Sequence, residues 1–290
     1  MHIVVPIKQV PETNAVRMDE DSGTMIREGV EGIVNPLDLY AIEAAIRLAE
    51  RHGGQTTAIS MGPPRAVTAL REALAMGIDS AVLISDKAFA GSDTWATSYV
   101  LAQAIRKLCC AEALPVGPGA AAPPTGAPPP ALPDLIICGE RATDGDTGQV
   151  GPGIASWLDL PVASYVGRID QVADGRCTVR RLVEDGHEVL DVQLPAVLTV
   201  VKEVADPRLP TLNGKLRAQS ANIPTWTPAD LDVDPAKIGL EGSPTRVVKI
   251  FRPKVARQCE KVLATDEQTL ADAVDRLVEF LRLRQVPQSP

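Results

Sequence analysis

The sequence is poor in aromatic residues and carries no excess of positive charge. Phe, Trp and Tyr make up 3% of its 290 residues, whereas hydrophobic residues of all kinds reach 45%. Because β-sandwiches usually have aromatic residues in their cores, this composition favours helices packed on an aliphatic parallel sheet. The net charge of -8 argues against a nucleic-acid-binding protein, which needs Lys and Arg to neutralise phosphates.

Other features are also missing. No run of 18 apolar residues exists, so we expect no membrane insertion, and the first residues, MHIVVPIKQV, lack the parts of a signal peptide. The five cysteines form no C-x-x-C pair and the three histidines are scattered, so no metal site is expected. We therefore expect a cytoplasmic protein with reduced thiols.

The first half of the chain alternates between short aliphatic runs and amphipathic segments. This pattern predicts strands at 2–7, 55–60, 81–85 and 135–138, with helices at 35–52, 65–76, 93–108 and up to about 158. Such alternation predicts an α/β fold with a doubly wound parallel sheet. If the fourth strand lies on the other side of the first from the second and third, a ligand site falls at the carboxyl ends of strands one and four.

Later segments depart from this alternation. Eight prolines in residues 111–133 predict an insertion loop at the surface. The runs 176–183 and 188–194 flank Asp185-Gly186 and predict a small antiparallel hairpin region. Residues 206–222 lack periodicity and are expected to form a surface loop.

The C-terminal part predicts an extended arm. Residues 247–251 are strand-like and 269–283 have the periodicity of an amphipathic helix, but 224–244 contain few core residues. We expect a nucleotide-binding domain over 1–223 and an arm over 224–290. The arm either docks on a partner chain or folds back on its own domain.

The loop Gly139–Pro152, GERATDGDTGQVGP, is the candidate site. It follows a strand and precedes a helix, where backbone N–H groups converge on phosphates, and its glycines Gly145, Gly148 and Gly151 allow a ligand to approach. It is neither a Walker loop nor the usual dinucleotide fingerprint. Asp144 and Asp146 would repel a phosphate, so we expect them to bind backbone N–H groups or ribose hydroxyls. The alternative is a tight turn between strand and helix.

No pairing of a nucleophile with a base is recognisable, so no catalytic residue is predicted and nucleotide or cofactor binding is favoured over hydrolysis. One alternative is a nucleotide-binding regulatory module. An ATP-dependent ligase or hydrolase would need a phosphate loop near the first strand, where the chain has Lys8-Gln9-Val10-Pro11 instead.

Several stretches together match a known family. They are IKQVPET (7–13), NPLDLYAIEAA (35–45), ALAMGIDSAVLI (73–84), GSDTWATSYVLAQAI (91–105), ATDGDTGQVGP (142–152) and VKEVADPRLPTLNGKLRA (201–218). With these motifs the chain resembles the β subunit of electron-transfer flavoprotein, in order from the N-terminus to about residue 285. The proline-rich stretch 111–133 departs from the family pattern.

The resemblance implies a Rossmann-like fold of the adenine-nucleotide-binding type and a heterodimer with an α subunit. It implies electron transfer through flavin to an acyl-CoA dehydrogenase, a similar flavoenzyme or a quinone-linked acceptor. In one subgroup the β subunit holds AMP. In the electron-bifurcating subgroup it holds FAD that NADH reduces, and ferredoxin or flavodoxin is a further acceptor. The loop DGDTGQVGP and the hydroxyls of Thr94 and Thr97 favour the FAD-holding subgroup, with AMP as the alternative.

The resemblance also assigns residues. The cofactor-binding positions that it implies are Pro6, Asn35, Pro36, Leu37, Asp38, Met61, Thr94, Thr97, Gly139, Glu140, Arg141, Ala142, Thr143, Asp144, Gly145, Asp146, Thr147, Gly148, Gln149 and Val150.

A recognition loop over about 203–217 is implied to bind the dehydrogenase, with Leu212 as the anchor that inserts into a pocket of the partner. The neighbouring cations Arg208, Lys215 and Arg217 are expected to steer an acidic partner.

Overall fold

A computed structural model describes residues 1–12, 17–18, 25–26, 32–110, 132–248 and 261–283. The chain divides into two compact units, residues 1–248 and 249–290. The predicted insertion loop at 111–133 falls almost entirely outside the described residues.

The first unit is built around a nine-stranded sheet with the order β11-β10-β9-β12-β8-β1-β6-β7-β13. Its strands are β1 (His2–Pro6), β6 (Gln55–Met61), β7 (Ser80–Ile84), β8 (Leu135–Gly139), β9 (Val162–Ala173), β10 (Arg176–Val183), β11 (Gly186–Gln193), β12 (Ala196–Val200) and β13 (Thr225–Trp226). Neighbouring strands from β13 to β9 are parallel, and β9, β10 and β11 are antiparallel. The predicted α/β fold is confirmed, and the predicted hairpin is an extension of the same sheet.

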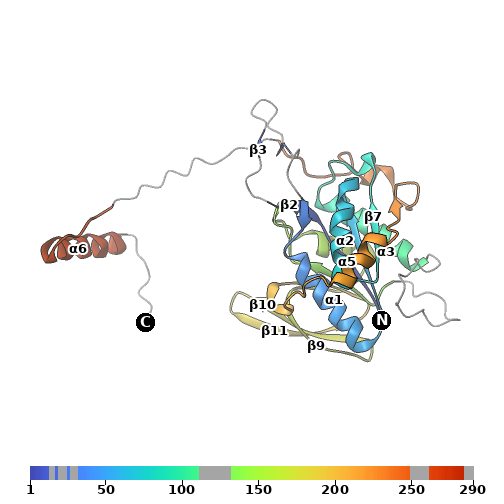
Figure 1. Ribbon diagram of the computed structural model, residues 1–290, viewed down its shortest axis with the longest axis horizontal. Coiled ribbons are helices and arrows are strands. Elements are labelled where there is room, and N and C mark those ends of the chain that lie inside the picture. Colours follow the sequence, from blue (N-terminus) through green and yellow to red (C-terminus); the bar gives the residue numbers. More distant parts are fainter. Residues whose placement is uncertain (13–16, 19–24, 27–31, 111–131, 249–260, 284–290) are drawn as a thin grey trace. The chain divides into compact units, whose positions relative to one another are not determined.

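Helices cover both faces of the sheet. On one face lie α1 (Asp38–His52), α2 (Val67–Met76) and α5 (Leu212–Ser220), which Figure 1 shows next to one another. On the other face lie α3 (Thr94–Cys110) and α4 (Val150–Leu158). Side chains of β1 alternate between the two cores, with Ile3 and Val5 in the first and Val4 in the second. Because β8 and β6 flank β1 on opposite sides, the sheet has its switch point between β1 and β8, as predicted.

Two short antiparallel ladders lie between β1 and α1. In one, β2 (Gln9–Pro11) pairs with β5 (Gly32–Val34), and in the other β3 (Arg17–Met18) pairs with β4 (Met25–Ile26). The strands are two or three residues long, which is too short for an alternating pattern to reveal them in the sequence.

The start of α1 differs from the prediction. The helix begins at Asp38, and Leu37 occupies the cap position without a side-chain hydrogen bond. Asn35 does not cap the helix because its amide group is used in contacts described below. At the start of α3, Asp93 Oδ1 accepts hydrogen bonds from the backbone N–H groups of Trp95 and Ala96 and so caps the helix.

The predicted surface loop at 206–222 contains a helix, α5, so that expectation is wrong. Thr211 Oγ1 caps it by accepting a hydrogen bond from Gly214 N at 3.0 Å. Gly214 packs so closely against α2 that a Cβ there would lie 2.1 Å from the carbonyl oxygen of Ala75. Arg217 donates to the carbonyl oxygens of Leu74 and Ile78 at the end of α2. Contacts with α2 therefore stabilise a helix that has no apolar periodicity of its own.

The boundary of the first unit lies at Val248 and not at residue 223. Strand β13 pairs with β7, and Trp226, Leu231 and Ile238 are buried in the core under α3. The first part of the predicted arm therefore folds back on its own domain. The predicted strand at 247–251 is not formed at Val247 and Val248, and its other residues lie outside the described part.

The second unit contains the predicted C-terminal helix, α6 (Glu267–Leu283). Its apolar side chains are open to solvent, with Leu270, Val274 and Leu277 exposed by 54%, 50% and 57%. Among the described residues of both units, the helices are too short or too polar to span a bilayer.

Candidate functional site

Three segments meet at the carboxyl ends of β1 and β8. Lys8 follows β1, Asn35 to Asp38 lead into α1, and Arg141 to Thr143 belong to the loop after β8. Lys8 N donates a hydrogen bond of 2.7 Å to Asp38 Oδ2, and Asn35 N donates one of 2.8 Å to the carbonyl oxygen of Lys8. Direct contacts therefore join the three segments at the predicted switch point of the sheet.

Asn35 is the hub of these contacts. Its Nδ2 donates to Asp38 Oδ1 and to the carbonyl oxygen of Arg141, both at 2.9 Å, and its Oδ1 accepts from Thr143 N at 3.1 Å. The side chain is fully buried, so each of its polar groups needs a partner inside the protein. Asn35 thus joins the start of α1 to the glycine-rich loop instead of capping the helix.

Asp38 is a buried carboxyl group with only neutral donors in hydrogen-bond contact. Burial raises its pKa to about 7, although the hydrogen bonds from Asn35 and Lys8 act in the opposite direction. Gly139 makes room for it, because a Cβ on Gly139 would lie 2.4 Å from Asp38 Oδ1 and 2.9 Å from the carbonyl group of Leu37. The close approach of β8 to the start of α1 therefore requires glycine at position 139.

Asp144 and Asp146, two of the three acidic residues of the loop, form ion pairs. Asp144 Oδ1 lies 2.8 Å from Lys8 Nζ, and Asp146 Oδ1 lies 2.9 Å from Arg141 Nε. The structure thus pairs these carboxylates with cations and not with backbone N–H groups, and the alternative contact with ribose hydroxyls stays a prediction. Since a cation neutralises each of them, their repulsion of a phosphate is reduced. Lys8 follows β1, at whose carboxyl end the ligand was expected, but it is not among the cofactor-binding positions that the resemblance implies.

The glycines of the loop have different roles. A Cβ on Gly145 would meet no atom within 4 Å, and Gly148 has a φ of +64°, a conformation that favours glycine. A Cβ on Gly151, however, would lie 2.5 Å from Thr199 Cγ2. Glycine at position 151 therefore allows α4 to pack on β12, and the predicted approach of a ligand to its backbone stays a prediction.

The start of α4 provides backbone donors beside the loop. The first N–H groups of a helix have no partner within the helix, and here they belong to Val150 and Gly151, because Pro152 has none. They lie at the positive end of the helix dipole and follow a loop whose carboxylates are paired. This arrangement fits the phosphate groups of a nucleotide, and neither FAD nor AMP is excluded by it.

The other residues that the resemblance implies lie near the carboxyl ends of the strands or at the start of α3. Pro6 ends β1 and pairs with Ile59, and Met61 ends the neighbouring β6. Thr94 and Thr97 lie in the first turns of α3, which packs on α4 where Gly153 meets Ser98. Within the described residues, no hydrogen bond joins the side chain of Thr94 or Thr97 to the glycine-rich loop, so their predicted contact with a ring system remains a prediction.

Tyr165 was not predicted from the sequence. It lies in β9 with a φ of +60°, which is strained for a bulky side chain, and it is 45% exposed. Its hydroxyl oxygen lies 3.9 Å from the position of a Cβ on Gly148. Tyr165 therefore borders the loop, and no residue pattern reveals it because its conformation arises where the register of β9 and β12 shifts.

The predicted partner-binding residue lies apart from these contacts, at the start of α5. Leu212 is 74% exposed, as an anchor for a partner would have to be. Of the cations expected to steer a partner, Arg208 is bound to Glu43 and Glu50, and Arg217 is bound to carbonyl groups of α2. Both arginines are half-buried and bound within the chain, whereas Lys215 is exposed, and the steering of an acidic partner stays a prediction.

A family model described as the electron transfer flavoprotein domain matches residues 22–231, well over half of the chain. The chain belongs to the electron transfer flavoprotein family. This membership agrees with the mostly parallel sheet and its strand order.

Individual relatives cover nearly the whole chain. An electron transfer flavoprotein subunit beta from Thermoanaerobacterium thermosaccharolyticum is 43% identical over 99% of this chain and 100% of its own. The caffeyl-CoA reductase-Etf complex subunit CarD of Acetobacterium woodii is 41% identical over 99% of this chain and 100% of its own. Protein FixA of Azorhizobium caulinodans is 41% identical over 94% of this chain and 92% of its own.

The packing of Gly139 predicts that Gly139→Ala destabilises the ligand-free protein by about 1–3 kcal/mol, because the new Cβ overlaps Asp38 and Leu37. Gly145→Ala is the matched control in the same loop and should change stability by less than about 0.5 kcal/mol. Urea unfolding of the ligand-free chain measures both values. Equal stability of the two variants would contradict the close packing at Gly139.

The raised pKa of Asp38 predicts a pH dependence of stability. Between its unfolded value of 3.8 and its folded value of about 7, the folded state holds a proton that the unfolded state has released. The free energy of unfolding should therefore fall as pH rises from 4 to 7, by up to about 1.4 kcal/mol per pH unit.

Asp38→Asn, which cannot titrate, supplies the reference curve for this measurement. Only the difference between the two unfolding curves is compared, so a constant loss of stability in the variant does not matter. A difference that stays constant from pH 4 to pH 7 would show that Asp38 titrates normally.

Proposed function

We propose that this chain is the β subunit of a heterodimeric electron-transfer flavoprotein that holds FAD at the carboxyl ends of β1 and β8. The observation that carries the proposal is the contact of Asn35 with both Asp38 and the loop at Arg141 and Thr143. It holds a glycine-rich loop and the start of α4 at the switch point of the sheet, where nucleotides bind in this architecture.

Bound FAD would supply the redox chemistry, with NADH as the donor and electrons leaving through the flavin of the α subunit. The chain itself would bind and orient the cofactor. The N–H groups at the start of α4 and the loop from Gly139 to Val150 would hold its phosphates. Lys8 and Arg141 would keep the charges of Asp144 and Asp146 paired beside them. Thr94 and Thr97 would offer hydroxyls to the ring system.

The alternative within the family is a β subunit that holds AMP and has no redox centre of its own. Two features favour FAD. The loop from Asp144 to Pro152 is glycine-rich and its carboxylates are paired, and CarD, similar over its full length, is named as part of a reductase-Etf complex. A bifurcating role with ferredoxin or flavodoxin as second acceptor belongs to the same proposal. Family membership gives no support to a nucleotide-binding regulatory module.

The partner of the heterodimer would be the α subunit, held in part by α6. This helix has an apolar row, Leu270, Val274 and Leu277, that is about half exposed in the described residues. An amphipathic helix with an open apolar face is typical of a segment that is covered by another chain.

The cofactor proposal predicts two FAD molecules per heterodimer. The heterodimer is purified without added nucleotide, denatured, and its released flavin and AMP are quantified by chromatography against the protein concentration. Two flavins and no AMP support the proposal. One flavin with one equivalent of AMP would assign the chain to the alternative subgroup.

The exposed Leu212 predicts a contact with the electron acceptor. Truncation of a buried anchor typically costs about 2 kcal/mol, so Leu212→Ala should slow electron transfer to an acyl-CoA dehydrogenase roughly tenfold or more. Reduction of the flavin by NADH should be unchanged. Val189→Ala on β11, where Val189 is 63% exposed, is the matched control. Unaltered dehydrogenase kinetics in Leu212→Ala would refute the anchor.

A further inference from the structure

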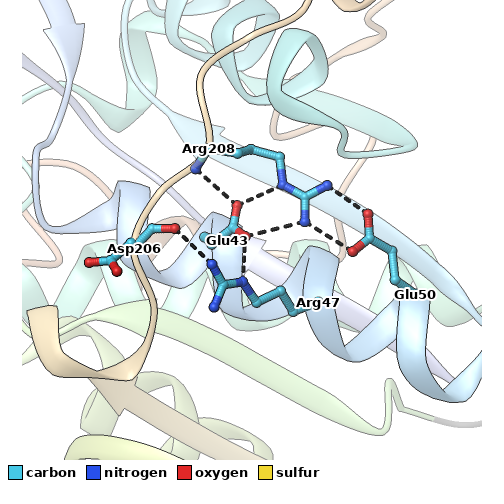
Figure 2. Close-up of polar contacts among 5 residues, drawn as sticks. All are labelled: Glu43, Arg47, Glu50, Asp206 and Arg208. Carbon is cyan, nitrogen blue, oxygen red and sulfur yellow. Dashed lines mark hydrogen bonds and ion pairs between the residues drawn. The ribbon is translucent and has the colours of Figure 1, made fainter.

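The segment before α5 is fastened to α1 by a network of charged groups (Figure 2). Arg208 donates from Nε to Glu43 Oε2 at 2.8 Å and from Nη2 to Glu43 Oε1 at 3.2 Å. It also donates to both carboxylate oxygens of Glu50, at 2.6 and 3.0 Å. A single guanidinium group thus spans two carboxylates that lie two turns apart on the helix.

The backbone takes part in the same network. Arg208 N donates to Glu43 Oε2 at 3.2 Å, and Arg47 Nη2 donates to the carbonyl oxygen of Asp206 at 3.1 Å. Arg47 Nε also donates to Glu43 Oε1 at 2.6 Å. The path of residues 206–208 is therefore fixed through main-chain atoms as well as through the Arg208 side chain.

Glu43 is the buried centre of the network, with 1% of its side chain exposed. Burial alone would raise its pKa, but the hydrogen bonds from Arg208 and Arg47 outweigh burial and hold the pKa below its usual value. Glu43 is thus a charged group inside the protein that depends on Arg208, and the segment must stay in place to cover it.

A row of exposed leucines begins at Leu209, the residue that follows Arg208. Leu209, Leu212 and Leu216 are 86%, 74% and 57% exposed. At the far end of α5, Arg71 and Arg217 bind carbonyl groups that join this helix to α2. The three leucines therefore lie between the Arg208 contact on one side and the contacts of Arg71 and Arg217 on the other. The Arg208 contact joins the chain to α1, whereas the other two join it to α2.

We propose that Arg208 is a positioning residue: it holds the segment before α5 against α1, and thereby presents the leucine row Leu209, Leu212 and Leu216 for docking of the electron acceptor. The proposal rests on the proposed function for the identity of the docking partner. The position of the row relative to α1 is a property of this chain alone. Arg208 would not touch the acceptor, because its guanidinium is occupied by Glu43 and Glu50.

The test compares Arg208→Gln, Glu43→Gln and the double variant in the heterodimer. The probe is a short-chain acyl-CoA dehydrogenase in its oxidised form, and the readout is the rate at which it reoxidises the flavin of the dithionite-reduced heterodimer. Each single variant should raise the KM for the dehydrogenase about tenfold with kcat unchanged. The double variant should add little to either single variant, because both remove the same contact.

Arg176→Gln is the matched control, because it removes a surface ion pair with Asp191 on β10 and β11, away from α1 and α5. Its KM should equal that of the unmodified heterodimer. An unchanged KM in Arg208→Gln, a loss confined to kcat, or an equal effect of Arg176→Gln would each overturn the proposal.

Hydrogen exchange gives a second readout that needs no acceptor. In Arg208→Gln, amides of 209–216 should exchange faster while those of β1, β6 and β8 stay protected. If the unmodified heterodimer does not react with the dehydrogenase, the proposed partner fails and the exchange rates alone decide the role of Arg208. Unchanged exchange over 209–216 would overturn it.

Discussion

The buried carboxyl group of Asp38 is the constraint on which the arrangement of the site depends. It accepts hydrogen bonds from Lys8 N after β1 and from Asn35, which in turn holds the loop after β8. A buried polar group needs its partners, so the three segments must approach one another closely enough to supply them. Gly139 permits this approach because a side chain there would overlap Asp38. The arrangement of the three segments at the switch point is therefore a consequence of how one acid is buried.

Helix α1 carries a second buried acid in a contrasting environment. Glu43 contacts two arginines and keeps its charge, whereas Asp38 contacts neutral donors and has a raised pKa. The carboxyl group at the start of the helix therefore holds its proton to a higher pH than an ordinary aspartate does. Farther along the helix, the charged Glu43 binds Arg208 and so attaches the segment that leads to α5. One helix in this way supports both the cofactor site and the segment proposed to meet the acceptor.

The sequence predicted the parallel sheet well because its buried strands are continuous aliphatic runs and its long helices have a clear period. It failed at α5 and β13 for a shared reason. Helix α5 has one buried residue, Ala218, and is held by Thr211 and by hydrogen bonds to α2. Strand β13 has two residues and depends on pairing with β7. Elements stabilised by contacts with distant segments have no local pattern by which to recognise them.

In the candidate site, too, the features with a local sequence pattern were predicted and the contacts between distant residues were not. The sequence by itself determined that a glycine-rich loop would follow the fourth parallel strand at a switch point, because hydrophobic runs and right-handed crossovers restrict the topology. Only the tertiary structure decided that Asp144 and Asp146 pair with Lys8 and Arg141, that Gly151 packs against Thr199, and that Arg208 binds Glu43. Such contacts join residues far apart in the chain, and a charged or small residue does not indicate which partner the fold will bring to it.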